Sequence, residues 1–280
     1  MKKTDSTTQP AISTLRMNNL KGRVMNVLGR VRSKEILLIY APTMDIESVS
    51  HLANLLSRYG NVTVPDLPGF GGMSSFYKIN EKPTVDNYAA YLAALVRLKY
   101  KKRRITIVTL GASFAFAVRM LQRYSNIESK TNGVISIGGY PHSQDLSVNI
   151  AERYAKIFGY SIVNSAVIGG PINAALKFNR IVLTSSEQEL PPEYDFRTAS
   201  FVSRALLNID LCKQRTGIPL HYIPSKSFGT LKTHDLAQHL QVVFKKVNKH
   251  QGRTKKDIIE SLKSKNGITK FMPSTVLQIL

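Results

Sequence analysis

The chain has 280 residues, of which 43% are hydrophobic and 8% aromatic, so it can bury a sizeable core, and general disorder does not fit this composition. Cys212 is the only cysteine, which excludes an intrachain disulfide and a zinc site built from cysteines and favours a reducing, cytoplasmic compartment. The formal net charge of +21 favours weak association with polyanions, whether nucleic acid, anionic lipid or acidic substrates.

The positive charge is concentrated in three stretches, at residues 20–34, 97–104 and 245–256. No RNA-recognition, zinc-finger or basic-zipper pattern accompanies them, so solvated charge runs explain them more simply than specific binding. A nucleic-acid or anionic-membrane binder nevertheless remains one alternative function.

Two segments bear on targeting and membranes. Residues 1–19 have a basic tip without a following apolar segment, and we expect a flexible tail rather than a signal peptide. Residues 158–176 carry no charge, but they contain Asn, Ser, Gly and Pro, which fit a bilayer span poorly. We therefore expect no transmembrane segment.

The first half of the chain alternates short apolar runs with helical patterns. Strands are predicted at 35–42, at the start of 61–72, at 105–110 and at 133–139, and helices at 46–60, 84–100 and 114–124. Thr84 is the expected N-cap of the second helix, with Asp86 in its first turn. This alternation predicts an α/β fold with a mostly parallel sheet flanked by helices, whose binding loops lie at the carboxyl ends of the strands.

The alternation lapses between residues 145 and 205 and then resumes. Strands at 217–224 and 242–247 and helices at 234–241 and 255–265 are expected after it. The predicted organisation is a tail (1–19), a first core part (20–144), an inserted helical lid (145–205), a second core part (206–268) and a C-terminal tail (269–280).

The residues that follow the strand at 105–110 carry the first chemical signal. Gly111 to Ala115 form a G-x-S-x-A pattern between a strand and a helix, the context of a nucleophile elbow. In that arrangement the hydroxyl of Ser113 stands clear of the sheet at a helix N-terminus, and the N–H of Phe114 donates to a developing oxyanion. An ordinary N-capping serine gives the same local pattern.

The chain here resembles the α/β-hydrolase family over most of its length. "DLPGFGG" (66–72) is similar to the family's D-x-P-G-x-G loop, residues 84–98 to the helix before the elbow strand, and residues 208–223 to the segment that leaves the lid. The resemblance implies an α/β-hydrolase fold, a serine nucleophile, a histidine after the last strand and an acid.

That resemblance implies Ser113 as nucleophile and His250 as base, although His250 also fits a surface histidine in a basic loop. Residues 225–230, where the family usually carries its acid, hold no carboxylate, and Asp145 is the candidate in its place. Beside Phe114, either Ala41 or Thr43 would supply the second oxyanion donor, because Pro42 has no N–H; otherwise the oxyanion hole is incomplete.

The leading functional hypothesis is a serine hydrolase that cleaves an ester, thioester or amide through an acyl-enzyme on Ser113. This chemistry needs no metal or organic cofactor. The apolar lid segment suggests a small-molecule substrate with a hydrophobic part, and the sequence does not indicate an oligomeric state. The alternative is an inactive relative that keeps the fold and binds a small molecule or a protein partner; the absent acid and Pro42 favour it.

Overall fold

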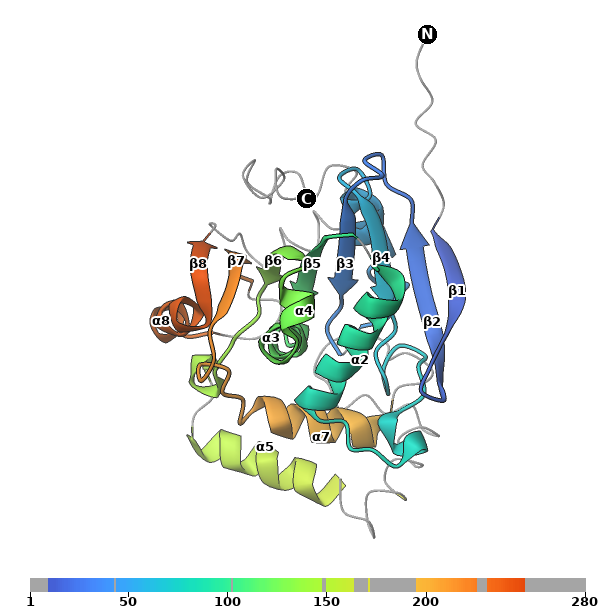
Figure 1. Ribbon diagram of the computed structural model, residues 1–280. Helices are drawn as coiled ribbons and strands as arrows, with labels where there is room; N and C mark the ends of the chain where they lie inside the picture. The colour runs from blue at the N-terminus through green and yellow to red at the C-terminus, as the bar shows by residue number, and fades with distance from the viewer. Residues whose placement is uncertain are drawn as a thin grey trace.

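The computed structural model describes residues 10–42, 44–101, 103–147, 150–163, 171, 195–225 and 231–249. One sheet of eight strands forms its centre, in the order β1-β2-β4-β3-β5-β6-β7-β8 (Figure 1). The strands are β1 (Ala11–Met17), β2 (Leu20–Val27), β3 (Glu35–Ile39), β4 (Asn61–Pro65), β5 (Ile105–Leu110), β6 (Thr131–Ile137), β7 (Thr216–Ile223) and β8 (Phe244–Lys249).

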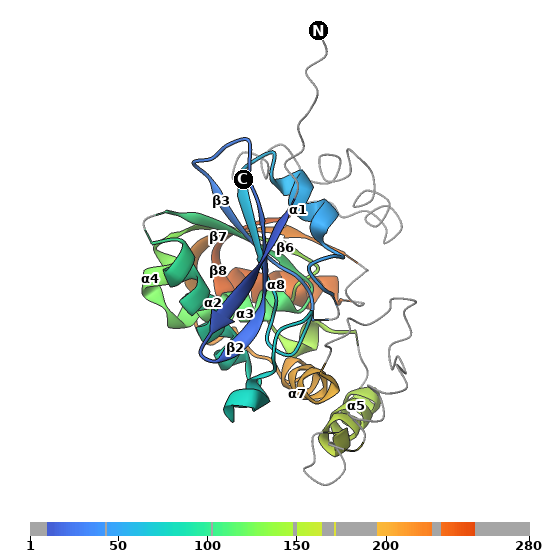
Figure 2. The same cartoon turned by 90° about the vertical axis from the view of Figure 1, so that its right-hand side faces the viewer.

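Helices connect the strands and cover the sheet. The α-helices are α1 (Ser50–Leu56), α2 (Val85–Lys99), α3 (Ser113–Arg123), α4 (Ser125–Glu128), α5 (Ile150–Val163), α7 (Phe196–Leu206) and α8 (Thr233–Val243). Two 3₁₀ turns, η1 (Phe76–Ile79) and η2 (Ser143–Asp145), lie in the connections. The helices α2, α3 and α4 pack together on one face of the sheet, whereas α1 lies on the other (Figure 2).

The strands from β4 to β8 pair in parallel, and only the β1–β2 and β2–β4 pairs are antiparallel. Every residue of β3 and β5 is buried, as expected for central strands of a parallel sheet with helices on both faces. The predicted α/β fold with a mostly parallel, helix-flanked sheet is confirmed. The strand predicted at 105–110 is β5, and Thr84 caps α2 by accepting a hydrogen bond from the N–H of Asn87.

The N-terminal boundary of the fold lies earlier than predicted. Residues 11–17 were expected in a flexible tail, but they form β1, which pairs with β2 along its whole length. Asn18 and Asn19 make the two-residue turn between them, both with positive φ (47° and 63°), as a type I′ hairpin turn requires. The core therefore begins at the hairpin and not at residue 20.

The predicted lid falls between β6 and β7, where the described residues form α5 and α7 and pack against each other. Asp145 precedes these helices and lies in η2. The action of this segment as a lid remains a prediction. The helix expected at 255–265 and the tail at 269–280 lie outside the described residues. None of the described helices combines the length and the apolar character that a membrane span needs.

Candidate functional site at the turn after β5

The turn that joins β5 to α3 has Gly111 at its apex. Gly111 has a φ of +54°, in the left-handed region that glycine adopts without the steric penalty of a Cβ. Its N–H donates to the carbonyl of Ile137 at the end of β6, at a distance of 2.9 Å. The turn is thus fixed against the neighbouring strand by its own backbone.

The position of this apex changes the register of the predicted motif. In a nucleophile elbow the reactive side chain belongs to the residue at the sharp strand-to-helix turn, and small residues lie two positions before and after it. Counted from Gly111, those two residues are Thr109 and Ser113. The apex thus lies at Gly111, two residues before Ser113, and the residue at the apex has no side chain beyond hydrogen.

Ser113 lies inside the protein, with no exposed surface. Its hydroxyl lies 2.8 Å from the carbonyl oxygen of Ile39 and 2.9 Å from that of Leu110, and it accepts a hydrogen bond from the N–H of Leu110 at 3.2 Å. The expectation that this hydroxyl stands clear of the sheet is wrong, because it bonds to the carboxyl ends of β3 and β5. Ser113 is not the N-cap of α3 either; Ala112 occupies that position.

Of the expected oxyanion donors, Phe114 has its N–H bonded at the start of α3, and the role of Ala41 as a donor stays a prediction. The N–H of Phe114 donates to the carbonyl of Gly111 over 3.2 Å, and its fully buried ring stacks on Phe244. Ala41 is buried, and its carbonyl accepts a hydrogen bond from Met44 in a tight turn. Phe114 is thus already engaged within the first turn of α3. Thr43 lies outside the described residues.

Asp145 pairs with His239, a residue other than the predicted base, His250. Its carboxylate lies 2.6 Å from Nδ1 of His239 on α8, and it accepts a hydrogen bond from the N–H of His142 at 3.0 Å. The rings of His142 and His239 are tilted against each other, with centroids 4.6 Å apart. Asp145 is fully buried, and this burial raises the pKa of its carboxyl group against the opposing hydrogen bond from His239.

The structure does not join Asp145 and Ser113 into one site. Within the described part of the chain, no hydrogen bond or ion pair connects the two side chains. His250, the predicted base, lies outside the described residues. The pair that the structure does form, Asp145 with His239, links η2 to α8. The part of this pair that the sequence could indicate is the place of His239, which lies within the helix predicted at 234–241.

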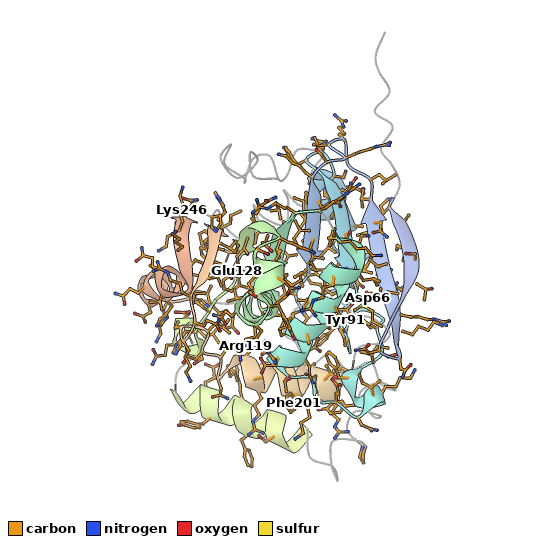
Figure 3. All side chains as sticks on the ribbon, viewed as in Figure 1. Asp66, Tyr91, Arg119, Glu128, Phe201 and Lys246 are labelled. Carbon is orange, nitrogen blue, oxygen red and sulfur yellow. The ribbon has the colours of Figure 1, made fainter. Side chains whose placement is uncertain are left out.

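The loop after β4 contains a second buried carboxylate, Asp66. Its side chain accepts hydrogen bonds from Nε of Arg23 and from the hydroxyl of Tyr40, each at a distance of 3.0 Å. The hydroxyl of Tyr91 donates to the main-chain carbonyl of Asp66 at a distance of 2.7 Å, and the two residues lie side by side in Figure 3. These bonds fix the start of the 66–72 loop to β2, β3 and α2.

This carboxylate is unusual in its protonation. Burial raises the pKa of Asp66 from 3.8 to about 6, although Arg23 and Tyr40 both favour the ionised form. The loop beyond it turns sharply at Gly71, where an added Cβ would lie 2.3 Å from the Tyr40 hydroxyl. The 66–72 loop therefore shapes the carboxyl edge of the sheet through its backbone and through Asp66.

Across the described ranges, no cluster of three His, Cys, Asp or Glu side chains is placed to hold a metal ion.

Comparison with solved structures places this architecture. The chain is similar to the N-formylmaleamic acid deformylase of Pseudomonas putida S16, with a TM-score of 0.61 and 13% identity over 93% of this chain and 99% of that one. The Cif epoxide hydrolase of Acinetobacter nosocomialis gives a TM-score of 0.60 and 12% identity over 88% and 82% of the two chains. The chain has the α/β-hydrolase fold.

A haloalkane dehalogenase variant of Bradyrhizobium elkanii shares this α/β-hydrolase fold, with a TM-score of 0.58 and 16% identity over 87% of this chain and 89% of that one. No family model matches the sequence, and no curated protein matches it either. At these identities the likeness establishes the fold and not an activity. Function must then be argued from the residues at the site.

Proposed function

We propose that this chain is a binding protein on an α/β-hydrolase scaffold and that it does not form an acyl-enzyme. The observation that carries the proposal is Gly111 at the apex of the turn after β5. An acyl-enzyme needs a side-chain nucleophile at that place, and glycine supplies none. The two hydroxyls nearest along the chain belong to Thr109, which is fully buried, and to Ser113, which is bonded to the main chain of Ile39 and Leu110.

The ligand of this scaffold is a small molecule or a protein partner bound at the carboxyl edge of the sheet, where parallel α/β sheets place their sites. The 66–72 loop and the turn at Gly111 form described parts of that edge. The hydrogen bonds of Asp66 hold the loop in place without a ligand, which favours a preformed surface. A cytoplasmic location accompanies this proposal.

The competing proposal is the serine hydrolase of esters, thioesters or amides, with Ser113, His250 and Asp145 as its catalytic residues. It requires the Ser113 hydroxyl to leave two carbonyl partners and to turn outward. It also requires Asp145 to leave His239, the partner it contacts at 2.6 Å. Both changes cost free energy, since each breaks buried hydrogen bonds.

Labelling with a fluorophosphonate probe separates the two proposals. We expect no labelling of the folded wild-type protein under conditions that label a known serine hydrolase fully. Labelling that disappears in Ser113→Ala would overturn the binding-protein proposal. A Gly111→Ser variant places a hydroxyl at the apex, and labelling of this variant alone would identify position 111 as the nucleophile position.

A ligand screen tests the binding activity itself. A ligand that binds only the folded state stabilises it by mass action and so raises the melting temperature. At a free ligand concentration of one hundred times Kd, the free energy of unfolding rises by about 2.7 kcal/mol. We expect such a ligand to protect the 66–72 loop from hydrogen exchange. Protection confined to other parts of the chain would place the site elsewhere.

A further inference from the structure

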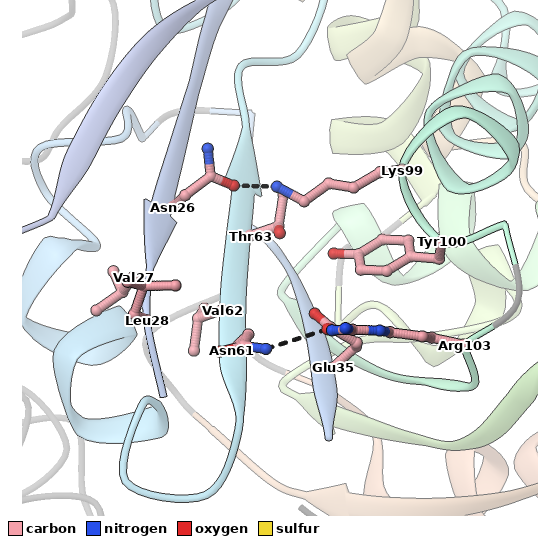
Figure 4. Close-up of a pocket in the computed structure, with 10 residues that line it drawn as sticks. All are labelled: Asn26, Val27, Leu28, Glu35, Asn61, Val62, Thr63, Lys99, Tyr100 and Arg103. Carbon is pink, nitrogen blue, oxygen red and sulfur yellow. Dashed lines mark hydrogen bonds and ion pairs between the residues drawn. The ribbon is translucent and has the colours of Figure 1, made fainter. Parts of the chain in front are cut away.

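A pocket opens at the end of the sheet opposite the turn at Gly111, where the parallel strands begin. Its volume is about 310 Å³, and it lies between the end of β2, the starts of β3 and β4, and the end of α2 (Figure 4). A pocket of this size holds a small ligand or one head group. The lining residues that matter are Asn26, Thr63, Lys99, Tyr100 and Arg103.

Tyr100 is one of the polar residues that line this pocket. Its side chain is 1% exposed, and its hydroxyl is enclosed beside the side chain of Thr63, whose hydrogen bond favours the ionised form. Burial raises the pKa of Tyr100, so the hydroxyl keeps its proton at neutral pH and acts as a donor. Because Thr63 acts as the donor in this bond, the proton of the Tyr100 hydroxyl remains for an acceptor bound beside it.

Lys99 supplies a positive charge at the mouth of the pocket. Its ammonium group contacts the side-chain oxygen of Asn26, and no carboxylate lies within ion-pair distance of it in the part of the chain that the structure describes. The one acidic lining residue, Glu35, is bonded to Arg103 and to Asn61. An anion in the pocket would thus meet Lys99 and the Tyr100 hydroxyl, while Arg103 offsets the charge of Glu35.

Further cations surround the pocket because separate basic stretches meet at this edge. Two backbone hydrogen bonds, each 2.9 Å long, join the loop before β3 to the start of β4 and the segment before it. The N–H of Arg30 donates to the carbonyl of Ser57, and the N–H of Asn61 donates to the carbonyl of Lys34. The ammonium of Lys130 donates to the carbonyl of Lys101 over 2.8 Å. We call the following set the amino-edge basic surface: Arg30, Arg32, Lys34, Arg58, Lys99, Lys101, Arg103, Arg104 and Lys130.

Two aliphatic side chains lie beside these cations. Leu28 is 56% exposed and lines the pocket, and Val31, in the same loop, is 39% exposed. Exposed aliphatic groups within a basic surface match the boundary between lipid head groups and acyl chains. Nucleic-acid surfaces instead present aromatic rings for base stacking, and the ring of Tyr100 is buried.

We propose that the amino-edge basic surface docks on an anionic phospholipid membrane, with one lipid phosphate in the pocket between Lys99 and Tyr100. Leu28 and Val31 enter the head-group layer, and the surrounding Lys and Arg residues attract the negative surface. Each such cation near the membrane contributes about 1 kcal/mol. The carboxyl edge of the sheet then faces away from the bilayer and stays open to its own ligand.

Vesicle flotation with the full chain tests this proposal. We expect the protein to float with phosphatidylcholine vesicles that contain phosphatidylserine and to stay behind with phosphatidylcholine alone. Lys99→Gln should lower the partition coefficient about fivefold, the loss that 1 kcal/mol predicts. Lys78→Gln is the matched control, because it removes the same charge from η1, away from the pocket.

Two further variants separate the pocket from general charge. Tyr100→Phe keeps the buried ring and removes only the hydroxyl, and it should weaken binding to anionic vesicles without loss of folding by circular dichroism. Leu28→Ser should weaken vesicle binding while leaving the net charge unchanged. Equal effects of Lys99→Gln and Lys78→Gln, or no effect of Tyr100→Phe, would overturn the pocket assignment. Equal flotation with neutral vesicles, or tighter binding of a single-stranded oligonucleotide than of anionic vesicles at the same salt, would overturn the membrane assignment.

Discussion

The hydroxyl of Ser113 is the clearest single-residue link in the sheet. It lies within 2.9 Å of carbonyl oxygens at the ends of two neighbouring strands, β3 and β5. Both carbonyls belong to buried residues, so the one proton of the hydroxyl is shared between acceptors that water cannot reach. The role is structural, and its loss should be measured in stability.

Ser113→Ala should therefore lower the free energy of unfolding by about 1–3 kcal/mol, the cost of leaving buried acceptors without a donor. Denaturant unfolding measures the change. Ser129→Ala is the control, because its hydroxyl bonds to Asn126 on the exposed surface. A Ser113→Ala protein as stable as wild type would contradict this role.

Asp66 predicts a pH dependence of stability with an unusual sign. Its pKa is about 6 in the folded protein against 3.8 in the unfolded chain, because burial opposes ionisation. Between these values the folded state binds the proton and the unfolded state does not, so this group's contribution falls as pH rises from 4 to 6. Relative to Asp66→Asn, the wild type should gain up to about 3 kcal/mol on acidification from pH 7 to pH 4.

A second carboxylate serves as the control for that experiment. Asp86 accepts a hydrogen bond from Arg119, which lowers its pKa, so stability from this group is lost as pH falls. Because both pKa values of Asp86, folded and unfolded, lie at or below 3.8, the wild type should lose stability relative to Asp86→Asn only as pH falls below about 4, and the difference should change little between pH 7 and pH 4. An equal gain for both wild-type and variant pairs between pH 7 and pH 4 would contradict the assignment for Asp66.

At the scale of single residues, the sequence predicted where the turn after β5 lies but not which residue occupies its apex. Thr109, Gly111, Ser113 and Ala115 are all small, so small residues two positions before and after the apex fit an apex at 111 or at 113 equally well. The φ of Gly111 distinguishes them, and it depends on the backbone bond to Ile137 in another strand. A long-range contact of this kind is not visible in a single sequence.

Helix α8 is held to the rest of the fold through a pair of side chains. Its His239 contacts the buried carboxylate of Asp145 in η2 at 2.6 Å, and the N–H of Lys232, at its N-terminus, donates to the Asp145 carbonyl over 2.8 Å. The two contacts fix both the side chain and the main chain of one residue. The helix and η2 should therefore open together rather than separately.

His239→Ala leaves the Asp145 carboxylate buried with only the His142 N–H as donor. We expect the free energy of unfolding to fall by about 1–3 kcal/mol and the amide protons of α8 to exchange faster. Gln238→Ala, an exposed neighbour on the same helix, should change neither quantity. Faster exchange spread evenly over the whole sheet would argue against a local link.

Periodicity predicted the elements of the core better than its edges. β5 and α2 match their predicted bounds closely, since continuous apolar runs and an N-cap are strong local signals. The β1–β2 hairpin was missed because β1 is an edge strand with mostly exposed residues and little apolar alternation. The pair Asn18–Asn19 was the available signal, since both residues tolerate positive φ.

At the scale of the whole molecule, the net charge of +21 means that folding brings many positive groups close together. Self-repulsion of this kind destabilises the folded state and is screened by salt. Raising NaCl from about 10 mM to about 1 M shortens the Debye length from about 30 Å to about 3 Å, and the melting temperature at pH 7 should rise. Near the sequence pI of about 10.1 the same series should have little effect, and an equal rise there would contradict the explanation.

The strand order has a consequence for how the chain leaves the ribosome. From β3 outward, β5, β6, β7 and β8 are added to the sheet in the order in which they are synthesised. Each new strand meets an edge that already exists, and none has to be inserted between strands that are already paired on that side. Because N-terminal parts fold first during synthesis, the nascent sheet can lengthen strand by strand while α5 and α7 are still being made. Until β7 emerges, the edge of β6 is the surface that a chaperone would have to cover.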